Sequence, residues 1–293
     1  MTSPATGRLP ISKAIGWSIA FLILTFLTGG LLILGAAILI TGSSSAADPW
    51  LRSARPESML LQAIVILVSA GLFTWLIGIR RLGLTRYDLR YFPGRQARAG
   101  WVTGLVAGAM TAGLAILISV VAGRARWVSD SGTLADYLLQ SAKTLAVLAP
   151  AAMSEEILFR GVPLVLLARA TGRGSAIVVI SVLFAGAHIL NPNATLLGLG
   201  NIALAGIFIA LAFYAPGGIW MAFGAHLGWN SLLAFLDTPV SGLPFDIPVL
   251  DYSPGNPTWL TGGSFGPEGG LAATMALTIG ILVLARWVTK VQS

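Results

Sequence analysis

Glutamate, arginine and histidine residues stand inside, or at the end of, stretches of this sequence that are otherwise apolar. Glu155 and Glu156 lie well inside one such stretch, and Arg160 follows at its end. The only two histidines, His188 and His226, lie in two later apolar stretches. A charged side chain within a membrane span costs about 2.5–3.5 kcal/mol on insertion scales, so it needs a partner or a wet cavity. These residues are therefore the first candidates for a functional site.

The spacing of the acidic pair predicts two different environments. Glu156 and Arg160 are four residues apart, so on a helix they share a face and can form an ion pair. Glu155 projects about 100° away from Glu156 and can face a cavity. Two carboxylates against one guanidinium leave one negative charge. A protonated histidine or a metal ion could balance it.

The histidines repeat the spacing of four. His226 pairs with Asn230 on one helix face, and Phe184 pairs with His188 on another. Three helices could thus converge on one polar pocket. Such a set suits hydrolysis, because a carboxylate and a histidine can activate a water while a second histidine and an amide stabilise an oxyanion. Glu155 and the two histidines could instead hold a zinc ion, although the sequential H-E-x-x-H motif is absent.

The elements that must position these residues are membrane helices. The chain is 56% hydrophobic and 10% charged, whereas soluble domains carry about 25% charged residues. We predict an all-α fold, a polytopic transmembrane helical bundle of about eight spans that forms a single membrane domain over residues 1–293. The predicted spans cover residues 15–40, 59–79, 101–123, 134–159, 175–190, 195–214, 218–236 and 270–288.

Basic residues predict the orientation of these spans. The loop after the second span holds six arginines between Arg80 and Arg98 and is predicted to be cytoplasmic. Eight spans then place both termini inside, with Arg8, Lys13, Arg286 and Lys290. Basic residues in short loops reflect topology, so no nucleic-acid partner is expected. We predict a multi-pass protein of the cell membrane, with the bilayer as its surroundings.

Two further segments have distinct compositions. Residues 237–268 are rich in proline and glycine and predict an external loop without regular structure. Gly104 and Gly108 form a G-x-x-x-G pattern, which is typical of close helix packing in lipid. The absence of cysteine excludes disulfides, thiolate metal sites and a cysteine nucleophile.

The three motifs occur in the order Glu155-Glu156-x-x-x-Arg160, Phe184-x-x-x-His188 and His226-x-x-x-Asn230 on separate apolar segments. This ordered trio resembles the CAAX protease and bacteriocin-processing family, also called the Abi or type II CAAX prenyl endopeptidase family. The resemblance covers residues of about 140–236, the expected catalytic core. The stretch from Thr261 to Glu268 also looks like a loop of bacterial members.

The resemblance implies an intramembrane endopeptidase in which Glu155 and His188 activate water. His226 and Asn230 would form the oxyanion site, and Arg160 would hold Glu156. The substrate would be a peptide or a membrane protein. Family members are described both as metalloproteases and as metal-independent glutamate proteases. We favour no cofactor, with a divalent metal such as zinc on Glu155, His188 and His226 as the alternative.

Two other functions fit a buried polar cluster. One is a catalytically silent immunity or scaffold membrane protein, and the other is a proton-coupled transporter.

The predicted depths of the candidate site residues in the membrane conflict with one another. Glu155 would lie near the cytoplasmic end of its span, His226 mid-span, and His188 near the outer end of its span. Straight helices would not bring them together, so the fourth or fifth span is expected to be tilted, broken or re-entrant.

Overall fold

The computed structural model describes residues 9–53 and 55–292, so Arg8 lies outside the described part of the chain. Eleven α-helices are present there: α1 (Ile11–Thr41), α2 (Ser44–Arg52), α3 (Pro56–Phe73), α4 (Gly94–Gly123), α5 (Leu134–Arg160), α6 (Val162–Thr171), α7 (Arg173–Gly186), α8 (Leu196–Tyr214), α9 (Ile219–Phe235), α10 (Thr258–Thr261) and α11 (Leu271–Gln292). A π-helix, Thr74–Arg81, extends α3. Strands β1 (Arg126–Ser129) and β2 (Leu250–Ser253) pair in antiparallel fashion.

The predicted all-α membrane bundle is confirmed. Each of the eight predicted spans coincides with one helix, namely α1, α3, α4, α5, α7, α8, α9 or α11. By length and composition, five of the described helices can cross a membrane: α1, α3 with its extension, α4, α8 and α11. Helix α5 is 27 residues long but carries charges, whereas α7 and α9 have only 14 and 17 residues. The helices that carry the polar motifs are therefore the ones that depart from ordinary spans.

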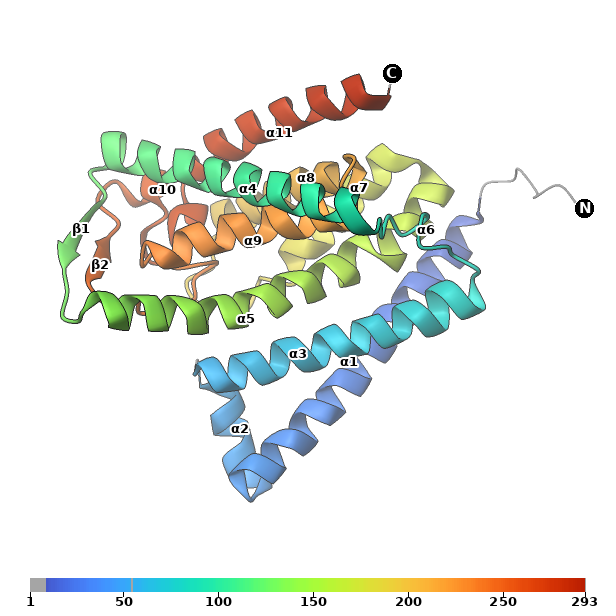
Figure 1. The fold of residues 1–293 in the computed structure, drawn as a ribbon, viewed down its shortest axis with the longest axis horizontal. Helices are drawn as coiled ribbons and strands as arrows, with labels where there is room; N and C mark the ends of the chain where they lie inside the picture. Colours follow the sequence, from blue (N-terminus) through green and yellow to red (C-terminus); the bar gives the residue numbers. More distant parts are fainter. Residues whose placement is uncertain (1–8, 54, 293) are drawn as a thin grey trace, which may run out of the picture.

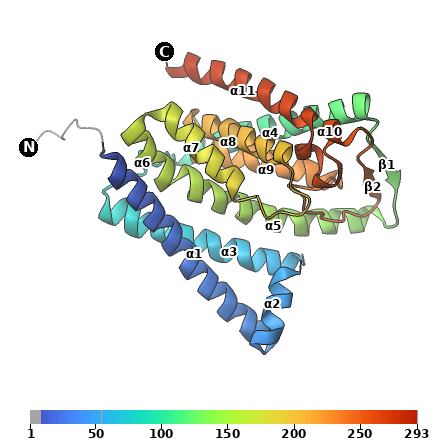
Figure 2. The ribbon, with the colours of Figure 1, turned by 180° about the vertical axis from the view of Figure 1, so that it is seen from behind.

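The helices form a central bundle with one pair set apart. In Figure 1, α4, α5, α8 and α9 lie together, and α11 covers them on one side. Helices α1 and α3 lie on the other side, joined at their far end by α2. Figure 2 shows the same arrangement from behind. Helix α3 packs on α5 and α1 packs on α6, so the pair covers the face of the bundle on which α5 runs.

Helices α4 and α9 make the closest packing in the bundle. A Cβ atom added at Gly104 or Gly108 would lie 2.2 Å from the Met221 oxygen or 1.9 Å from the Ala225 oxygen. These are distances that no real Cβ tolerates, so glycine is required where the two backbones touch. This contact is the small-residue packing that the G-x-x-x-G pattern predicts. It fixes the position of α9, which carries His226.

Helix α5 breaks before it reaches the basic loop. It ends at Arg160, and Pro163 lies in the first turn of α6. Proline has no N–H and its ring clashes with the carbonyl four residues earlier, here that of Phe159, so one straight helix cannot continue. The ten residues of α6 carry the chain on to Arg169, which pairs with Asp88 of the basic loop. Helix α6 therefore lies between the two adjacent glutamates and the basic loop.

The proline- and glycine-rich loop is more ordered than its composition predicted. Besides β2 and α10, it contains two 3₁₀ turns, Gly263–Phe265 and Pro267–Gly269. Asp237 holds its first part together, because its carboxylate accepts hydrogen bonds from the backbone N–H groups of Ile247 (2.9 Å) and Tyr252 (3.3 Å). The prediction of a loop without regular structure was thus wrong for these segments.

Candidate active site

The last turns of α5 hold a fully buried ion pair. Both side chains of Glu156 and Arg160 are 0% exposed, and Nη1 of Arg160 lies 3.3 Å from Oε1 of Glu156. Nη2 of Arg160 also donates to the carbonyl oxygen of Gly206 on α8, at 3.2 Å. The guanidinium carbon lies 4.4 Å from the centre of the Phe184 ring. The pair predicted from the spacing is present, and it connects α5 to α8 and α7.

His226 from α9 joins this pair. Its Nδ1 lies 2.8 Å from Oε1 of Glu156. Because an ionised carboxylate only accepts hydrogen bonds, Nδ1 is the donor in this contact. The other ring nitrogen, Nε2, then points to Oε2 of Glu155 at 3.8 Å. Glu156 thus orients the imidazole so that its second nitrogen faces the neighbouring glutamate.

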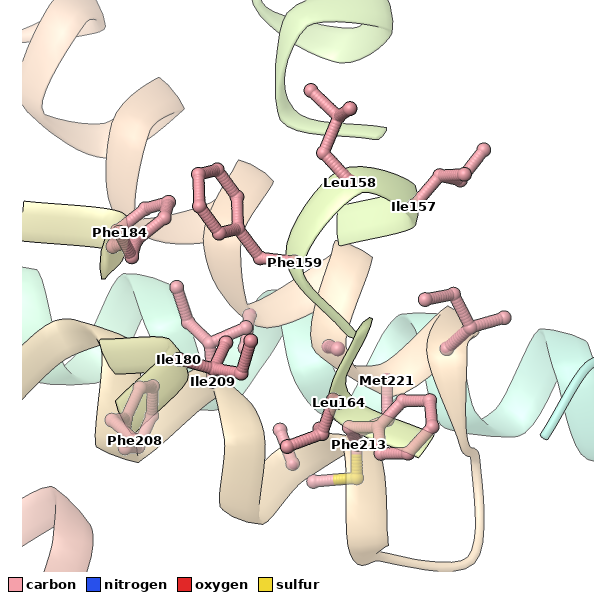
Figure 3. Packing of buried hydrophobic residues seen from close by; sticks show 14 of the residues in the cluster. Ile157, Leu158, Phe159, Leu164, Ile180, Phe184, Phe208, Ile209, Phe213 and Met221 are labelled. Atoms are coloured by element: carbon pink, nitrogen blue, oxygen red, sulfur yellow. The ribbon is translucent and has the colours of Figure 1, made fainter. Parts of the chain in front are cut away.

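His188 lies in the turn that follows α7. Its Nδ1 is 2.8 Å from the carbonyl oxygen of Phe184, so Nδ1 donates there, and Nε2 lies 4.0 Å from Oε2 of Glu155. The Phe184 ring packs between the two imidazoles, with ring centres at 4.8 Å from His188 and 5.9 Å from His226. Phe159 extends this aromatic cluster, because its ring centre lies 5.3 Å from that of Phe184. Figure 3 shows these two phenylalanine rings next to each other. The shortness of α7 is what places His188 at the level of Glu155.

Glu155 is the most exposed ionisable residue of the cluster. Its side chain is 31% exposed, and its Oε2 has no hydrogen-bond partner. The two imidazole Nε2 atoms are too far from Oε2 for direct hydrogen bonds, and polar atoms at such distances fit a bridging water. A free carboxylate oxygen between two imidazole nitrogens is an arrangement that can activate a water molecule.

The cavity beside Glu155 has a volume of about 450 Å³. His188, His226 and Asn230 also line it, so the structure brings together all four residues for which the sequence predicted a catalytic role. Most of the remaining lining is apolar and comes from α1, α3, α5, α7, α8, α9 and α11. The polar cluster therefore opens into a largely apolar chamber between the helix pair α1/α3 and the bundle.

Comparison with known proteins gives one match. Residues 138–232 match the family described as type II CAAX prenyl endopeptidase Rce1-like. This segment contains Glu155, His188 and His226, whose arrangement is described above. About a third of the chain thus resembles the CAAX protease family. No curated protein and no solved structure matches the chain.

Sequence analysis missed one residue in the wall of this cavity. Glu268 from the turn before α11 is buried, and its Oε1 accepts a hydrogen bond from Nε1 of Trp229 at 2.9 Å. Its Oε2 accepts from the backbone N–H of Ser241 and, at 3.0 Å, from the Ser241 hydroxyl. Burial raises the pKa of Glu268, while the donors from Ser241 and Trp229 act in the opposite direction. The signal in the sequence was an acidic residue within the stretch from Thr261 to Glu268.

The same wall is tied to the turn of His188. Asn191, three residues after His188, donates from Nδ2 to the carbonyl oxygen of Ser241 at 2.9 Å. On the far side, Nδ2 of Asn201 on α8 donates at 2.8 Å to the carbonyl oxygens of both Glu268 and Gly270. The loop after α9 is therefore fixed to α8, to α9 and to the turn after α7, and it forms part of the cavity wall.

The donor atoms of Glu155, His188 and His226 are of the types that zinc prefers. Donors about 2.1 Å from a tetrahedral zinc ion lie about 3.4 Å apart, whereas the two histidine nitrogens lie 4.0 and 3.8 Å from Oε2 of Glu155. Within the described residues, no group of three His, Cys, Asp or Glu side chains is arranged to hold a metal ion. These positions do not match the spacing of three zinc ligands, so the chemistry below is derived from the side chains alone.

Proposed function

We propose that this protein is an intramembrane endopeptidase of the CAAX protease family that hydrolyses a peptide bond with a water activated by Glu155. The observation that supports this most is the unpaired Oε2 of Glu155, which faces Nε2 of both His188 and His226 in a cavity among membrane helices. An ion pair that served only stability would not leave a carboxylate oxygen free beside two imidazoles. The family match supports proteolysis over transport or a silent scaffold.

The proposed first step is attack by water on the carbonyl carbon of the substrate. Glu155 takes a proton from the water while the oxygen of the water bonds to the carbonyl carbon. His188 orients the water through Nε2. The carbonyl oxygen becomes an oxyanion, which accepts hydrogen bonds from His226 and from the amide of Asn230. For this role His226 carries hydrogens on both nitrogens, and it lies between the carboxylates of Glu155 and Glu156.

The second step breaks the carbon–nitrogen bond of the tetrahedral intermediate. The protonated Glu155 gives its proton to the leaving nitrogen, which departs as an amine, and the carboxylate is regenerated. A helical substrate would resist this reaction because its backbone is fully hydrogen-bonded in the bilayer. The substrate segment in the cavity is therefore extended or unwound.

The test is hydrolysis of a membrane-partitioning peptide, with a fluorophore and a quencher on either side of the bond, by the full-length protein in proteoliposomes. Glu155→Gln should lower kcat by at least about 100-fold, the lower range for loss of a general base. Glu57→Gln is the matched control, since Glu57 is an exposed glutamate at the start of α3. Full activity of Glu155→Gln would refute the proposal. Proton-driven uptake without hydrolysis would favour a transporter.

We also propose that both termini are cytoplasmic in the cell membrane, on the basis of the arginines between Arg80 and Arg98. The native chain has no cysteine, so single cysteines can be introduced without background. In intact cells, a membrane-impermeant maleimide should label Asp246→Cys in the loop after α9 and leave Gln96→Cys in the basic region unlabelled. The reverse pattern would invert the topology.

A further inference from the structure

A basic cluster lies at one end of the helix pair α1/α3. It consists of Lys13, in the first turn of α1, and of Arg80 and Arg81, the last two residues of the π-helix that extends α3. All three residues are exposed. The start of α1 and the end of the π-helix lie side by side in Figures 1 and 2, and the two elements are in contact. The cluster therefore combines residues from both helices of the pair on one surface.

Two tryptophans position the guanidinium groups of this cluster. Because a π-helix bonds residue i to residue i+5, Arg80 lies one turn after Trp75, and its guanidinium carbon is 4.4 Å from the centre of that ring. The guanidinium carbon of Arg81 lies 5.5 Å from the ring centre of Trp17 on α1, within the range of a cation–π contact. Lys13 precedes Trp17 by four residues, so the two share a face of α1. Tryptophan rings favour the membrane–water interface, which places the basic cluster at the level of the lipid headgroups.

The basic cluster has no carboxylate partner within the described part of the chain. The ion pairs found there involve other residues. The only acidic residue between Arg80 and Arg98 is Asp88, and its carboxylate is paired with Arg169 of α6. Three positive charges thus face the surroundings of the protein without a protein anion to match them.

An apolar strip leads along α3 to this cluster. Val68, Leu72 and Leu76 precede Arg80 at intervals of four residues, so they lie on one side of α3 and its extension. Their side chains are 62%, 43% and 37% exposed. The stretch from Val68 to Leu76 rises about 12 Å, which fits within one leaflet of a bilayer whose apolar core is about 30 Å thick. A ligand that covers both the strip and the cluster has an anionic head and an apolar tail.

We propose that the basic cluster and the apolar strip together bind an anionic phospholipid. The phosphate accepts hydrogen bonds from the two guanidinium groups, and one acyl chain lies along the strip. A free phosphate ion gains nothing from the apolar surface, so the strip selects the lipid. The proposed cytoplasmic position of the basic loop places this site in the leaflet whose surface is negative. The site does not depend on the proposed hydrolysis.

The expected effect on binding follows from the attraction between basic residues and an anionic membrane. One Lys or Arg near such a surface strengthens the attraction by about fivefold. Loss of both arginines of the cluster therefore weakens binding by about 25-fold at most, and salt reduces this factor. A change of about tenfold is expected at low ionic strength.

The experiment is native mass spectrometry of the purified full-length protein in a neutral detergent. Phosphatidylglycerol and phosphatidylcholine with identical acyl chains are titrated separately, and the Kd of the first bound lipid is measured. Wild-type protein should bind phosphatidylglycerol more tightly by about tenfold or more. The double variant Arg80→Gln/Arg81→Gln should raise the Kd for phosphatidylglycerol by about tenfold and leave the Kd for phosphatidylcholine unchanged.

The matched control is the double variant Arg55→Gln/Arg126→Gln. It removes the same charge from two exposed arginines at the other end of the spans, one directly before α3 and one in β1, and it should bind phosphatidylglycerol like the wild type. Circular dichroism shows whether each variant is folded. Equal loss of binding in the two folded double variants would assign the effect to net charge and overturn the site.

Two further outcomes concern the wild-type protein and need no variant. Equal Kd values for phosphatidylglycerol and phosphatidylcholine would overturn the proposal, whether or not the variants fold. Displacement of bound phosphatidylglycerol by an excess of inorganic phosphate would show a site for the free ion and overturn the assignment to a lipid. Retention of the lipid in that excess is the expected result.

Discussion

Replacement of Arg160 by leucine should destabilise the protein strongly. The substitution leaves Glu156 fully buried with only His226 as a polar partner and removes the bond to the Gly206 carbonyl and the packing on Phe184. Removing one partner of a buried ion pair costs about 3–5 kcal/mol, because the other charge stays buried without compensation. We therefore expect a loss of about 3–5 kcal/mol in the free energy of unfolding.

The measurement is equilibrium unfolding in mixed micelles of increasing denaturing detergent, followed by helical circular dichroism. The matched control is Arg169→Leu, since Arg169 pairs with Asp88 and both side chains are partly exposed, at 45% and 31%. That change should cost less than about 1 kcal/mol. If Arg160→Leu costs no more than Arg169→Leu, the buried pair does not stabilise the fold as argued.

A double substitution separates the charge from the packing. The variant with leucine at both Arg160 and Glu156 no longer buries the Glu156 carboxylate without its guanidinium partner, so it should be more stable than Arg160→Leu alone by about 2 kcal/mol or more. Hydrolysis should not recover with stability, because His226 has lost the carboxylate that orients its ring. Additive effects of the two single substitutions would contradict this coupling.

Three further changes test other parts of the structure. Gly108→Ala should lower the unfolding free energy by more than about 2 kcal/mol, since the new Cβ would lie 1.9 Å from the Ala225 oxygen. The control Gly35→Ala should cause no such loss, because a Cβ at Gly35 meets nothing within 4 Å. Equal losses for the two variants in the unfolding titration would contradict this reasoning. Asn230→Ala should lower kcat by about 10²-fold with little change in KM, as expected for an oxyanion donor; a pure KM effect would assign Asn230 to substrate binding. Incubation with a strong chelator, followed by assay in chelator-treated buffer, should leave kcat unchanged, and loss of activity restored by zinc would show that a metal takes part.

The sequence predicted the helices well because membrane helices are set mainly by length and apolarity. It also identified Glu155, His188 and His226, since ionisable residues are rare in such segments. It missed α6, because ten residues are too few for a span and the arginine at 169 indicated a loop. A proline alone does not show where the break falls, because Pro150 lies inside α5 without ending that helix.

The place of Glu268 in the cavity wall could not be predicted from the sequence for a different reason. Its position depends on contacts with Trp229 and Ser241, which are 39 and 27 residues away along the chain. A proline- and glycine-rich segment has no periodic pattern that indicates which face it covers. Only the three-dimensional fold shows that the loop after α9 returns to the cavity.

The return of this loop has a consequence for biosynthesis. A nascent chain that has emerged as far as α9 already contains Glu155, His188, His226 and Asn230. It still lacks Glu268, which completes the cavity wall. The polar cluster is thus made early, and one part of the cavity wall is made late. The cavity is complete only once α11, which contributes Leu277 to its lining, has also been made.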